Sequence, residues 1–183
     1  MCVVFPPGAA QAKLDLLEGM SQRLGIRIVT TIKGDAARSL PIPQGMKFDR
    51  ILADVTCSGF GTLRRNPDLK WRRGEGDIKR LSELQFSILR NLGEYVREGG
   101  VLIYSTCTVF REENEDVVEK FLDENPQFQF NSIDEILSEK CRPFLHNRYF
   151  KTFPPTDKMD GFFVARLIKS SGHNLAGKRM DDA

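Results

Sequence analysis

The sequence predicts an α/β fold in which a parallel sheet is finished by an antiparallel hairpin. Residues 50–54 and 101–104 are short apolar runs, and each is followed by a cysteine-containing loop and then by a helical pattern. Residues 149–153 and 162–168 are strand-like and are separated by a proline- and glycine-containing loop, which predicts the hairpin. Alternating helices and strands of this kind are typical of a doubly wound sheet. Few elements precede residue 26, so we expect the sheet to be incomplete at its N-terminal side.

The N-terminal part of the chain predicts one helix between two strands. Residues 1–10 begin with an apolar run that the sequence PPG interrupts, as a strand entering a loop would. Apolar residues recur at helical spacing over residues 11–24, and Gly25 is suited to the C-terminal cap of that helix. Residues 26–32 alternate and are β-branched, which predicts a second strand. Asp35 follows the end of this strand.

The central part predicts two strand–loop–helix units. Residues 48–54 form the first strand, and a glycine-bearing loop with the sequence CSGFG follows it. A helix with one apolar face is expected to begin near Asp77, a good N-cap residue, and to end at Gly99-Gly100. The second strand, 101–104, leads to a helix over about residues 112–124, whose first-turn carboxylates suit the helix dipole.

The C-terminal part is less regular. Residues 132–135, with the sequence SIDE, have the form of a capping box, which predicts a short helix. Residues 154–161 are expected to be the loop of the terminal hairpin. Residues 169–183 are polar and contain glycine, as a flexible tail would. We therefore predict a single, truncated domain over residues 1–168.

The bulk composition excludes several classes of protein. The net charge is only +2, from 27 Lys and Arg against 25 Asp and Glu, so charge alone does not indicate nucleic-acid binding. The four cysteines show no CxxC motif and no regular spacing, which argues against a metal site or a disulfide framework and favours a reducing compartment. No apolar run approaches the ~18 residues of a membrane span, and no signal peptide is visible. A cytoplasmic protein without a metal is the expectation.

Two cysteines stand at equivalent places in the chain. Cys57 follows the strand 48–54 and Cys107 follows the strand 101–104. In a parallel sheet, ligands bind outside the carboxyl ends of the strands, so a nucleophilic thiolate at either position would face a ligand. The alternative is that each cysteine is a small buried apolar residue. A thiol redox or thiol hydrolase site is a weaker alternative, because the chain offers neither a CxxC motif nor a histidine near either cysteine.

Carboxylates and a basic stretch supply further candidate site residues. Asp35 and Asp54 both end strands and could accept hydrogen bonds from a ligand, or be ordinary loop and cap aspartates. The segment 64–73 carries five basic residues against one aspartate, a local charge of +4, around Trp71. Such a combination can hold phosphates and stack on bases, although a solvated basic loop has the same composition. Its candidate RNA-binding residues are Arg64, Arg65, Lys70 and Arg72.

Three long motifs occur in order along the chain. Residues 48–68 contain FDRILADVTCSGFG and RRNPD, residues 104–115 contain YSTCT and EENE, and residues 160–165 are DGFFVA. They resemble the FDRILxDaPCSGxGxxRRxPD, YsTCSxxxxENE and DGFFxA motifs of the Sun/Fmu (RsmB-like) RNA cytosine-C5 methyltransferases. Gly34-Asp35-Ala36 is similar to that family's acidic strand-end motif. The resemblance extends over about residues 13–169.

This resemblance implies a Rossmann-like S-adenosylmethionine methyltransferase fold with a terminal antiparallel strand. It implies that Cys107 is the nucleophile that adds to C6 of cytosine, and that Cys57 assists when C5 loses its proton and the enzyme is released. Asp54 would lie at the base and the cofactor, and Asp35 near the adenine. The implied substrate is RNA, namely rRNA, with the target base in structured RNA or flipped out of its stack.

The sequence departs from the family pattern in two places. Thr56 stands where the family has a proline before the first cysteine. The glycine-rich cofactor loop is absent in its usual form, because residues 2–8 are at best an eroded counterpart and no residue matches the loop lysine or the ribose-binding acid. Two hypotheses follow. One is the catalytic part of an RNA cytosine-C5 methyltransferase, and the other is a non-catalytic RNA-binding or scaffold relative that has lost cofactor binding.

Overall fold

The computed structural model describes residues 2–4, 11–134 and 136–171, and it describes side chains from residue 11 onward. The backbone divides into two compact units, Met1–Met46 and Lys47–Ala183, and each is treated by itself. Most of the expected tail, from residue 172, lies outside the described residues, and the single domain expected over residues 1–168 stays a prediction. In the described part of the chain, no helix is both long and apolar enough to cross a membrane.

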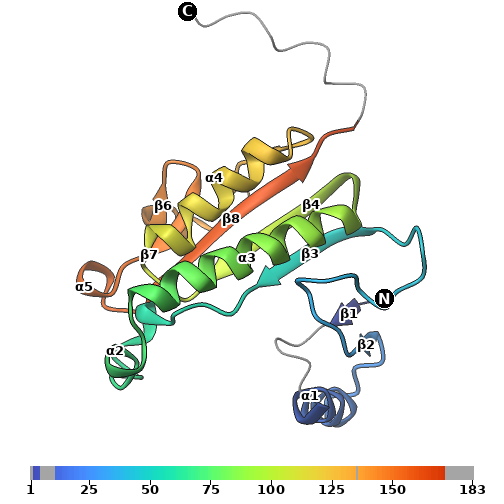
Figure 1. The fold of residues 1–183 in the computed structure, drawn as a ribbon, viewed down its shortest axis with the longest axis horizontal. Coiled ribbons are helices and arrows are strands. Elements are labelled where there is room, and N and C mark those ends of the chain that lie inside the picture. Colours follow the sequence, from blue (N-terminus) through green and yellow to red (C-terminus); the bar gives the residue numbers. More distant parts are fainter. Residues whose placement is uncertain (1, 5–10, 135, 172–183) are drawn as a thin grey trace, which may run out of the picture. The chain divides into compact units, whose positions relative to one another are not determined.

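The first unit is a parallel strand pair with a helix between its strands (Figure 1). Strand β1, Cys2–Val4, pairs with β2, Val29–Thr31, and α1, Gln11–Arg23, lies between them in sequence. Strand β2 is shorter than the run 26–32 suggested. The helix end explains this, because Gly25 has a φ of 69° and the N–H of Ile26 returns to Ser21 O at 2.8 Å.

The second unit is built on a mixed sheet. Strand β3, Phe48–Asp54, runs parallel to β4, Val96–Thr106, and β4 pairs with the antiparallel strand β8, Phe162–Lys169. The start of β8 pairs with β7, Tyr149–Thr152, and its end pairs with β5, Phe128–Phe130. The short strand β6, Leu145–His146, lies beyond β7. The expected parallel pair and terminal hairpin are therefore both present.

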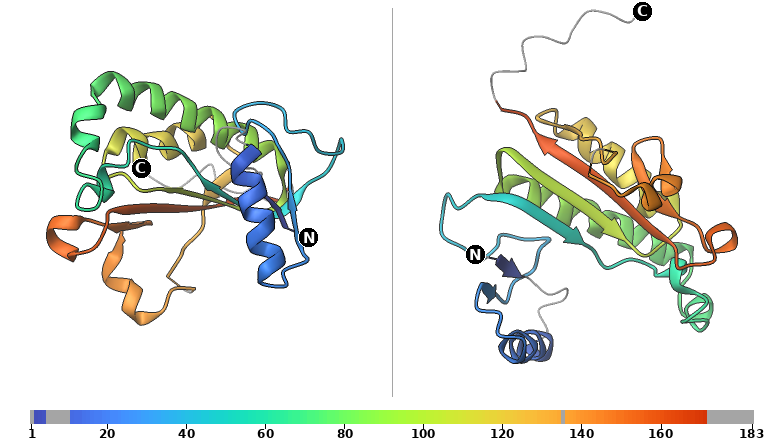
Figure 2. Two further views of the ribbon diagram at one scale, coloured as in Figure 1. Left: turned by 90° about the horizontal axis from the view of Figure 1, so that it is seen from below. Right: turned by 180° about the vertical axis from the view of Figure 1, so that it is seen from behind.

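Helices cover one face of this sheet. Helix α3, Glu75–Tyr95, and α4, Glu115–Glu124, lie side by side on it (Figures 1 and 2). The register aligns Leu102 with Leu167 and Tyr104 with Ala165, and all four side chains are fully buried. Because side chains alternate across a strand, this buried set belongs to the helix-covered face. Residues at the intervening positions, such as Ile103, are half-exposed on the other face.

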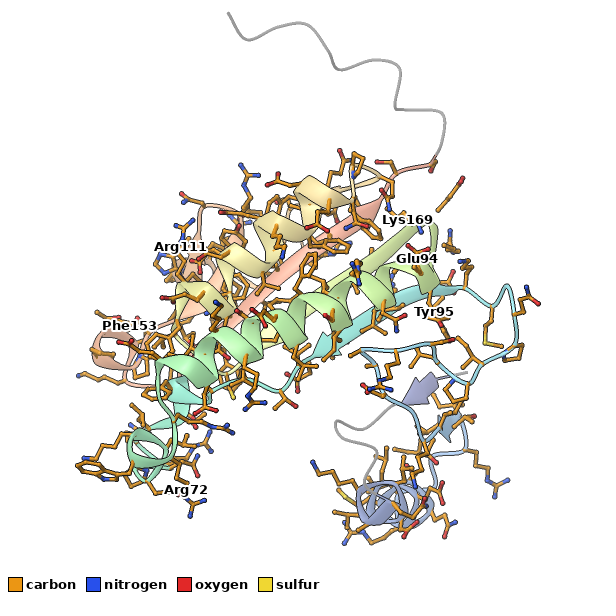
Figure 3. All side chains as sticks on the ribbon, in the orientation of Figure 1. Arg72, Glu94, Tyr95, Arg111, Phe153 and Lys169 are labelled. Atoms are coloured by element: carbon orange, nitrogen blue, oxygen red, sulfur yellow. The ribbon has the colours of Figure 1, made fainter. Side chains whose placement is uncertain are left out.

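The end of α3 differs from the expectation. The helix ends at Tyr95, four residues before Gly99, and both glycines lie inside β4. The pairing of β3 with β4 shifts register between Phe48 and Arg50. Gly99 lies in β4 opposite this irregularity and has a φ of 69°. Lys169 from β8 donates to the carbonyls of Gly93 and Val96 at 3.2 and 3.1 Å, at the helix end where Glu94 and Tyr95 lie (Figure 3).

Several smaller elements differ as well. The short helix expected at 132–135 is not formed in residues 132–134, where Ser132 Oγ accepts the N–H of Asp134 at 3.2 Å in a local turn. Helix α4 begins at Glu115 and not near residue 112, since a 3₁₀ turn, Arg111–Glu113, precedes it. The structure adds a 3₁₀ helix at Glu139–Phe144 and the short helices α2, Leu69–Arg72, and α5, Pro154–Asp157.

Candidate functional site

The two strand-end cysteines are in direct contact. Asp54 pairs with Ser105 at the carboxyl ends of β3 and β4, and the N–H of Val55 continues the pairing to Ser105 O at 3.1 Å. The chains then diverge into the two loops, and the Sγ atoms of Cys57 and Cys107 lie 3.3 Å apart. Cys57 Sγ also accepts the N–H of Cys107 at 3.3 Å. Both thiols are free and half-buried, so the tertiary fold joins residues 50 positions apart.

This contact makes the two thiols chemically unequal. The hydrogen bond from Cys57 stabilises a thiolate on Cys107 and lowers the pKa of Cys107 from 9.0 to about 7, against the opposing effects of burial and of the Asp54 charge. The same contact, together with burial, raises the pKa of Cys57. At neutral pH, a large fraction of Cys107 is therefore thiolate and Cys107 is the better nucleophile, while Cys57 holds its proton.

Asp54 lies beside an open hollow of about 820 Å³ on the sheet face opposite the helices. Its Oδ1 accepts a hydrogen bond from Ser105 Oγ at 2.9 Å, and the carboxylate has further acceptor capacity. The floor of the hollow is apolar and its rim is charged. A ring the size of a nucleobase could lie on this floor while polar groups of the rim form hydrogen bonds with the edge of the ring. The lining residues are Leu52, Asp54, Arg64, Arg65, Ile103, Ser105, Phe150, Thr152, Lys158, Met159, Asp160, Phe162 and Val164.

Two of the four candidate RNA-binding side chains are already paired with carboxylates. Arg65 forms an ion pair with the buried carboxylate of Asp160, and Arg72 pairs with Asp68 at 3.0 Å. These pairs fix the turn that follows the Cys57 loop, so Arg65 in particular has a structural partner that the sequence did not suggest. Arg72 lies on α2, which projects away from the sheet (Figure 3).

The other two candidate side chains have no carboxylate partner among the described residues. Arg64 Nη1 donates to the carbonyl oxygen of Lys158 at 3.2 Å, and its side chain lines the hollow. Lys70 Nζ lies 5.0 Å from the ring centre of Trp71, which is 82 % exposed. A cation and an exposed indole side by side can contact a phosphate and a base.

A close backbone contact ties the C-terminal hairpin to both cysteine loops. The N–H of Gly61 donates to Cys107 O at 3.0 Å, and the N–H of Gly161 donates to Gly61 O at 2.8 Å. A Cβ at Gly61 would overlap the carbonyl oxygen of Gly161 and lie 2.7 Å from Cys107 O. This close approach requires glycine at position 61, and its two hydrogen bonds hold the Cys107 loop against the hairpin.

Sequence reasoning missed the buried polar residues beneath the site. Glu113, Asn114 and Ser58 are almost fully buried, and they link the loops that carry the two cysteines. The available signal is the acidic run EENE after Cys107, which we interpret from the sequence as a helix start and as part of a family motif, but not as a buried carboxylate. Carboxylates suited to a helix dipole and a carboxylate that is buried look the same in a sequence.

The remaining predicted cofactor residue lies in the other unit. Asp35 follows β2, accepts the N–H of Ala37 at 3.0 Å and pairs with Arg38 at 3.4 Å, so its carboxylate is engaged in a local turn. Most of the eroded glycine-rich loop, residues 5–8, lies outside the described residues. Within the described residues, no group of three or more His, Cys, Asp or Glu side chains is placed to hold a metal ion.

Comparison with known proteins identifies the family. The sequence profile of the family described as 16S rRNA methyltransferase RsmB/F matches residues 3–168. The chain belongs to the RsmB/F family. This confirms the family that the three motifs suggested.

Individual relatives of the RsmB/F chain support this assignment. It is 40 % identical over 158 residues to a probable ribosomal RNA small subunit methyltransferase B of Bacillus subtilis, covering 86 % of this chain and 35 % of that protein. The chain thus spans about a third of the length of this relative. The crystal structure of PH0851 has a TM-score of 0.80 at 32 % identity, over 91 % of this chain and 36 % of that chain.

A second solved structure gives similar agreement. NSun6 from Pyrococcus horikoshii, crystallised with SFG, has a TM-score of 0.76 at 26 % identity, and the match covers 92 % of this chain and 41 % of that chain. The fold predicted for this RsmB/F chain, a Rossmann-like methyltransferase sheet with an antiparallel end, is therefore confirmed.

Proposed function

We propose that this chain carries the catalytic residues of an S-adenosylmethionine-dependent enzyme that methylates C5 of cytosine in RNA, with rRNA as the substrate class. Its family and its ribosomal RNA methyltransferase relatives support RNA methylation. The observation that carries the cytosine-C5 chemistry is the thiol pair, in which a thiolate-forming Cys107 touches a protonated Cys57. Its free thiols fit a cytoplasmic enzyme.

The thiol pair suits a reaction by covalent addition. The Cys107 thiolate adds to C6 of the cytosine, which forms an S–C6 bond and moves an electron pair onto the ring, so that C5 becomes a carbon nucleophile. S-adenosylmethionine supplies the electrophilic methyl group when it is bound. After transfer, C5 loses its proton, the S–C6 bond breaks and the electron pair returns to the Cys107 sulfur as the thiolate. Covalent catalysis thereby replaces one difficult step with two easier ones.

The second half of the reaction assigns a task to Cys57. Its pKa is raised because it donates a hydrogen bond to the neighbouring thiolate and is buried. Once the Cys107 sulfur is bonded to C6, it carries no negative charge, and that cause of the raised pKa is removed. Cys57 can then release its proton to solvent, and the resulting thiolate accepts the C5 proton, directly or through water. The protonated Cys57 regains its high pKa when Cys107 leaves.

Asp54 is the carboxylate that fits a ligand best. It stands at the end of β3, it lines the hollow, and its hydrogen bond from Ser105 fixes one of its oxygens. The other oxygen can accept from the exocyclic amine of cytosine or from an amine or hydroxyl of S-adenosylmethionine. SFG, bound in the NSun6 structure, is an analogue of that cofactor. Asp35 is proposed to lie near the adenine, although its carboxylate is occupied locally here.

Calorimetry with S-adenosylmethionine tests the proposal most directly. We expect saturable binding of S-adenosylmethionine to the chain. Asp54→Asn should weaken this binding about tenfold, because a hydrogen bond to a charged group contributes about 1.5–3 kcal/mol. Asp49→Asn, an exposed aspartate on the same strand, is the matched control. If the chain and a longer protein that contains it both fail to bind the cofactor, the non-catalytic RNA-binding reading holds instead.

The basic stretch is proposed to hold RNA phosphates. The double variant Arg64→Ala/Lys70→Ala should weaken binding of structured RNA and lower the slope of log K against log salt by about 1 to 2, since each lost phosphate contact removes about one released counterion. The control is Lys79→Ala/Lys140→Ala, which removes the same net charge from exposed sites elsewhere. Equal slopes in both double variants would show that net charge, and not this stretch, governs binding.

A further inference from the structure

A buried carboxylate without a cation lies beneath the thiol pair. Glu113 is fully buried, and among the described residues it forms no ion pair. Three donors surround it: Ser58 N at 2.8 Å and Gln85 Nε2 at 2.9 Å reach Oε1, and Ser58 Oγ at 2.5 Å reaches Oε2. A charge buried in this way is costly unless donors are fixed around it. The surrounding segments are therefore strongly held at this carboxylate.

The hydrogen bonds around Glu113 reach the residues on both sides of Cys57. Ser58 follows Cys57 directly and gives the carboxylate two hydrogen bonds, one from its backbone and one from its side chain. Gln85 of α3 spans from Glu113 Oε1 to the carbonyl oxygen of Thr56 at 3.0 Å, the residue before Cys57. Glu113 and Gln85 thus fix the backbone on either side of the Cys57 sulfur.

The same turn also holds the segment of Cys107. Tyr104 OH donates to the backbone carbonyl of Glu113 at 2.6 Å. The neighbouring Asn114 accepts from Thr106 Oγ1 at 2.5 Å and donates to Thr108 O at 3.1 Å, so it contacts the residues on both sides of Cys107. Ser58 Oγ lies 2.8 Å from Thr108 Oγ1 and closes the network between the two loops.

We propose that Glu113 is a positioning residue that holds the Cys57 loop against the Cys107 loop and keeps the two sulfurs in contact. It touches neither sulfur and acts through Ser58 and Gln85. Its importance for methyl transfer rests on the function proposed above, but its effect on the sulfur contact does not. The role can therefore be tested without RNA and without a methyl donor.

The test measures how readily the two sulfurs can be joined. Diamide oxidises two thiols to a disulfide and is itself reduced to the hydrazine, which takes up both protons. In a background of Cys2→Ser/Cys141→Ser, the rate of Cys57–Cys107 disulfide formation is followed by mass spectrometry and divided by the Cys107 thiolate fraction. Glu113→Ala should lower this rate about tenfold or more, since misplacing reacting atoms by about 1 Å can cost 10²-fold.

Conservative and control variants separate positioning from general loss of structure. Glu113→Gln keeps an Oε1 acceptor for Ser58 N and Gln85 Nε2, so it should restore most of the rate. Because Asp54 and Glu113 both raise the pKa of Cys107 by their charge, the pH midpoint of Cys107 alkylation should fall in Glu113→Gln. Glu112→Ala, an exposed glutamate in the same turn, should leave both the rate and the midpoint unchanged.

The outcomes decide the proposal in each case. A folded Glu113→Ala variant that forms the disulfide at the wild-type rate would overturn it, as would a Glu113→Gln variant as slow as Glu113→Ala. If Glu113→Ala does not fold, Ser58→Ala decides, because it removes one of the three hydrogen bonds and leaves the carboxylate in place. A several-fold slower rate in Ser58→Ala supports the proposal, and an unchanged rate refutes it. Slower disulfide formation in Glu113→Ala with unchanged methyl transfer would count against the proposed function alone.

Discussion

Cys107→Ala should abolish the covalent protein–RNA adduct and lower methyl transfer by about 10³-fold or more, the scale on which loss of a covalent nucleophile acts in other enzymes. The reason is that addition of the thiolate to C6 is the first chemical step, and no later step can occur without it. Cys107 is the thiol whose pKa is lowered to about 7, so it is the one that supplies a thiolate at neutral pH.

Cys57→Ala should have the opposite signature. Addition still proceeds, although more slowly, because Cys107 loses the hydrogen bond that lowers its pKa. The group that accepts the C5 proton is missing, so a protein–RNA species should accumulate on a denaturing gel and resolve slowly. Cys141→Ala, a free thiol outside the site, is the control and should behave like the wild type. The assay uses a longer protein containing this chain if the chain alone binds no cofactor.

The two variants can also reverse the assignment. An adduct that survives Cys107→Ala and disappears in Cys57→Ala would exchange the two roles. Unchanged methyl transfer in both variants would show that the cysteines are structural. An exchange of the two roles is a real alternative, because the two sulfurs lie 3.3 Å apart and either one is within reach of the same ligand.

Gly61→Ala should destabilise the second unit by about 3 kcal/mol or more, at or beyond the upper end of the usual cost of overpacking. The added Cβ would meet the carbonyl oxygens of Gly161 and Cys107, and backbone atoms cannot rotate away as a side chain can. Two hydrogen bonds between these segments would also be lost or strained. Urea unfolding of the purified variant measures the effect.

Gly76→Ala is the matched control for this substitution. Gly76 lies in the first turn of α3, and a Cβ there meets nothing within 4 Å. Because alanine favours a helix over glycine, we expect this variant to be as stable as the wild type or up to about 1 kcal/mol more stable. A Gly61→Ala variant as stable as Gly76→Ala would mean that the hairpin and the Cys107 loop are not held by this contact.

The polar network beneath the site could not be predicted from the sequence. Ser58 and Glu113 are 55 positions apart, and Arg65 and Asp160 are 95 positions apart. The pattern of charges identified 64–73 as a basic stretch, but it could not show that Arg65 is paired with a buried carboxylate. The Ser58–Glu113 pairing depends on how the loops after β3 and β4 pack together, and the Arg65–Asp160 pairing depends on how the hairpin folds back over the cysteine loops.

By itself, the sequence determined the strand–loop–helix order, the hairpin and the place of both cysteines after parallel strands, because these depend on hydrophobic periodicity and on the residues next to each loop. The tertiary structure alone decided that the two sulfurs touch, that Glu113 is buried between their loops and that Gly61 must be glycine. Local patterns fix which face of an element is apolar. Only packing fixes which distant segment contacts that face, and the chemistry of Cys107 depends on its 3.3 Å contact with Cys57.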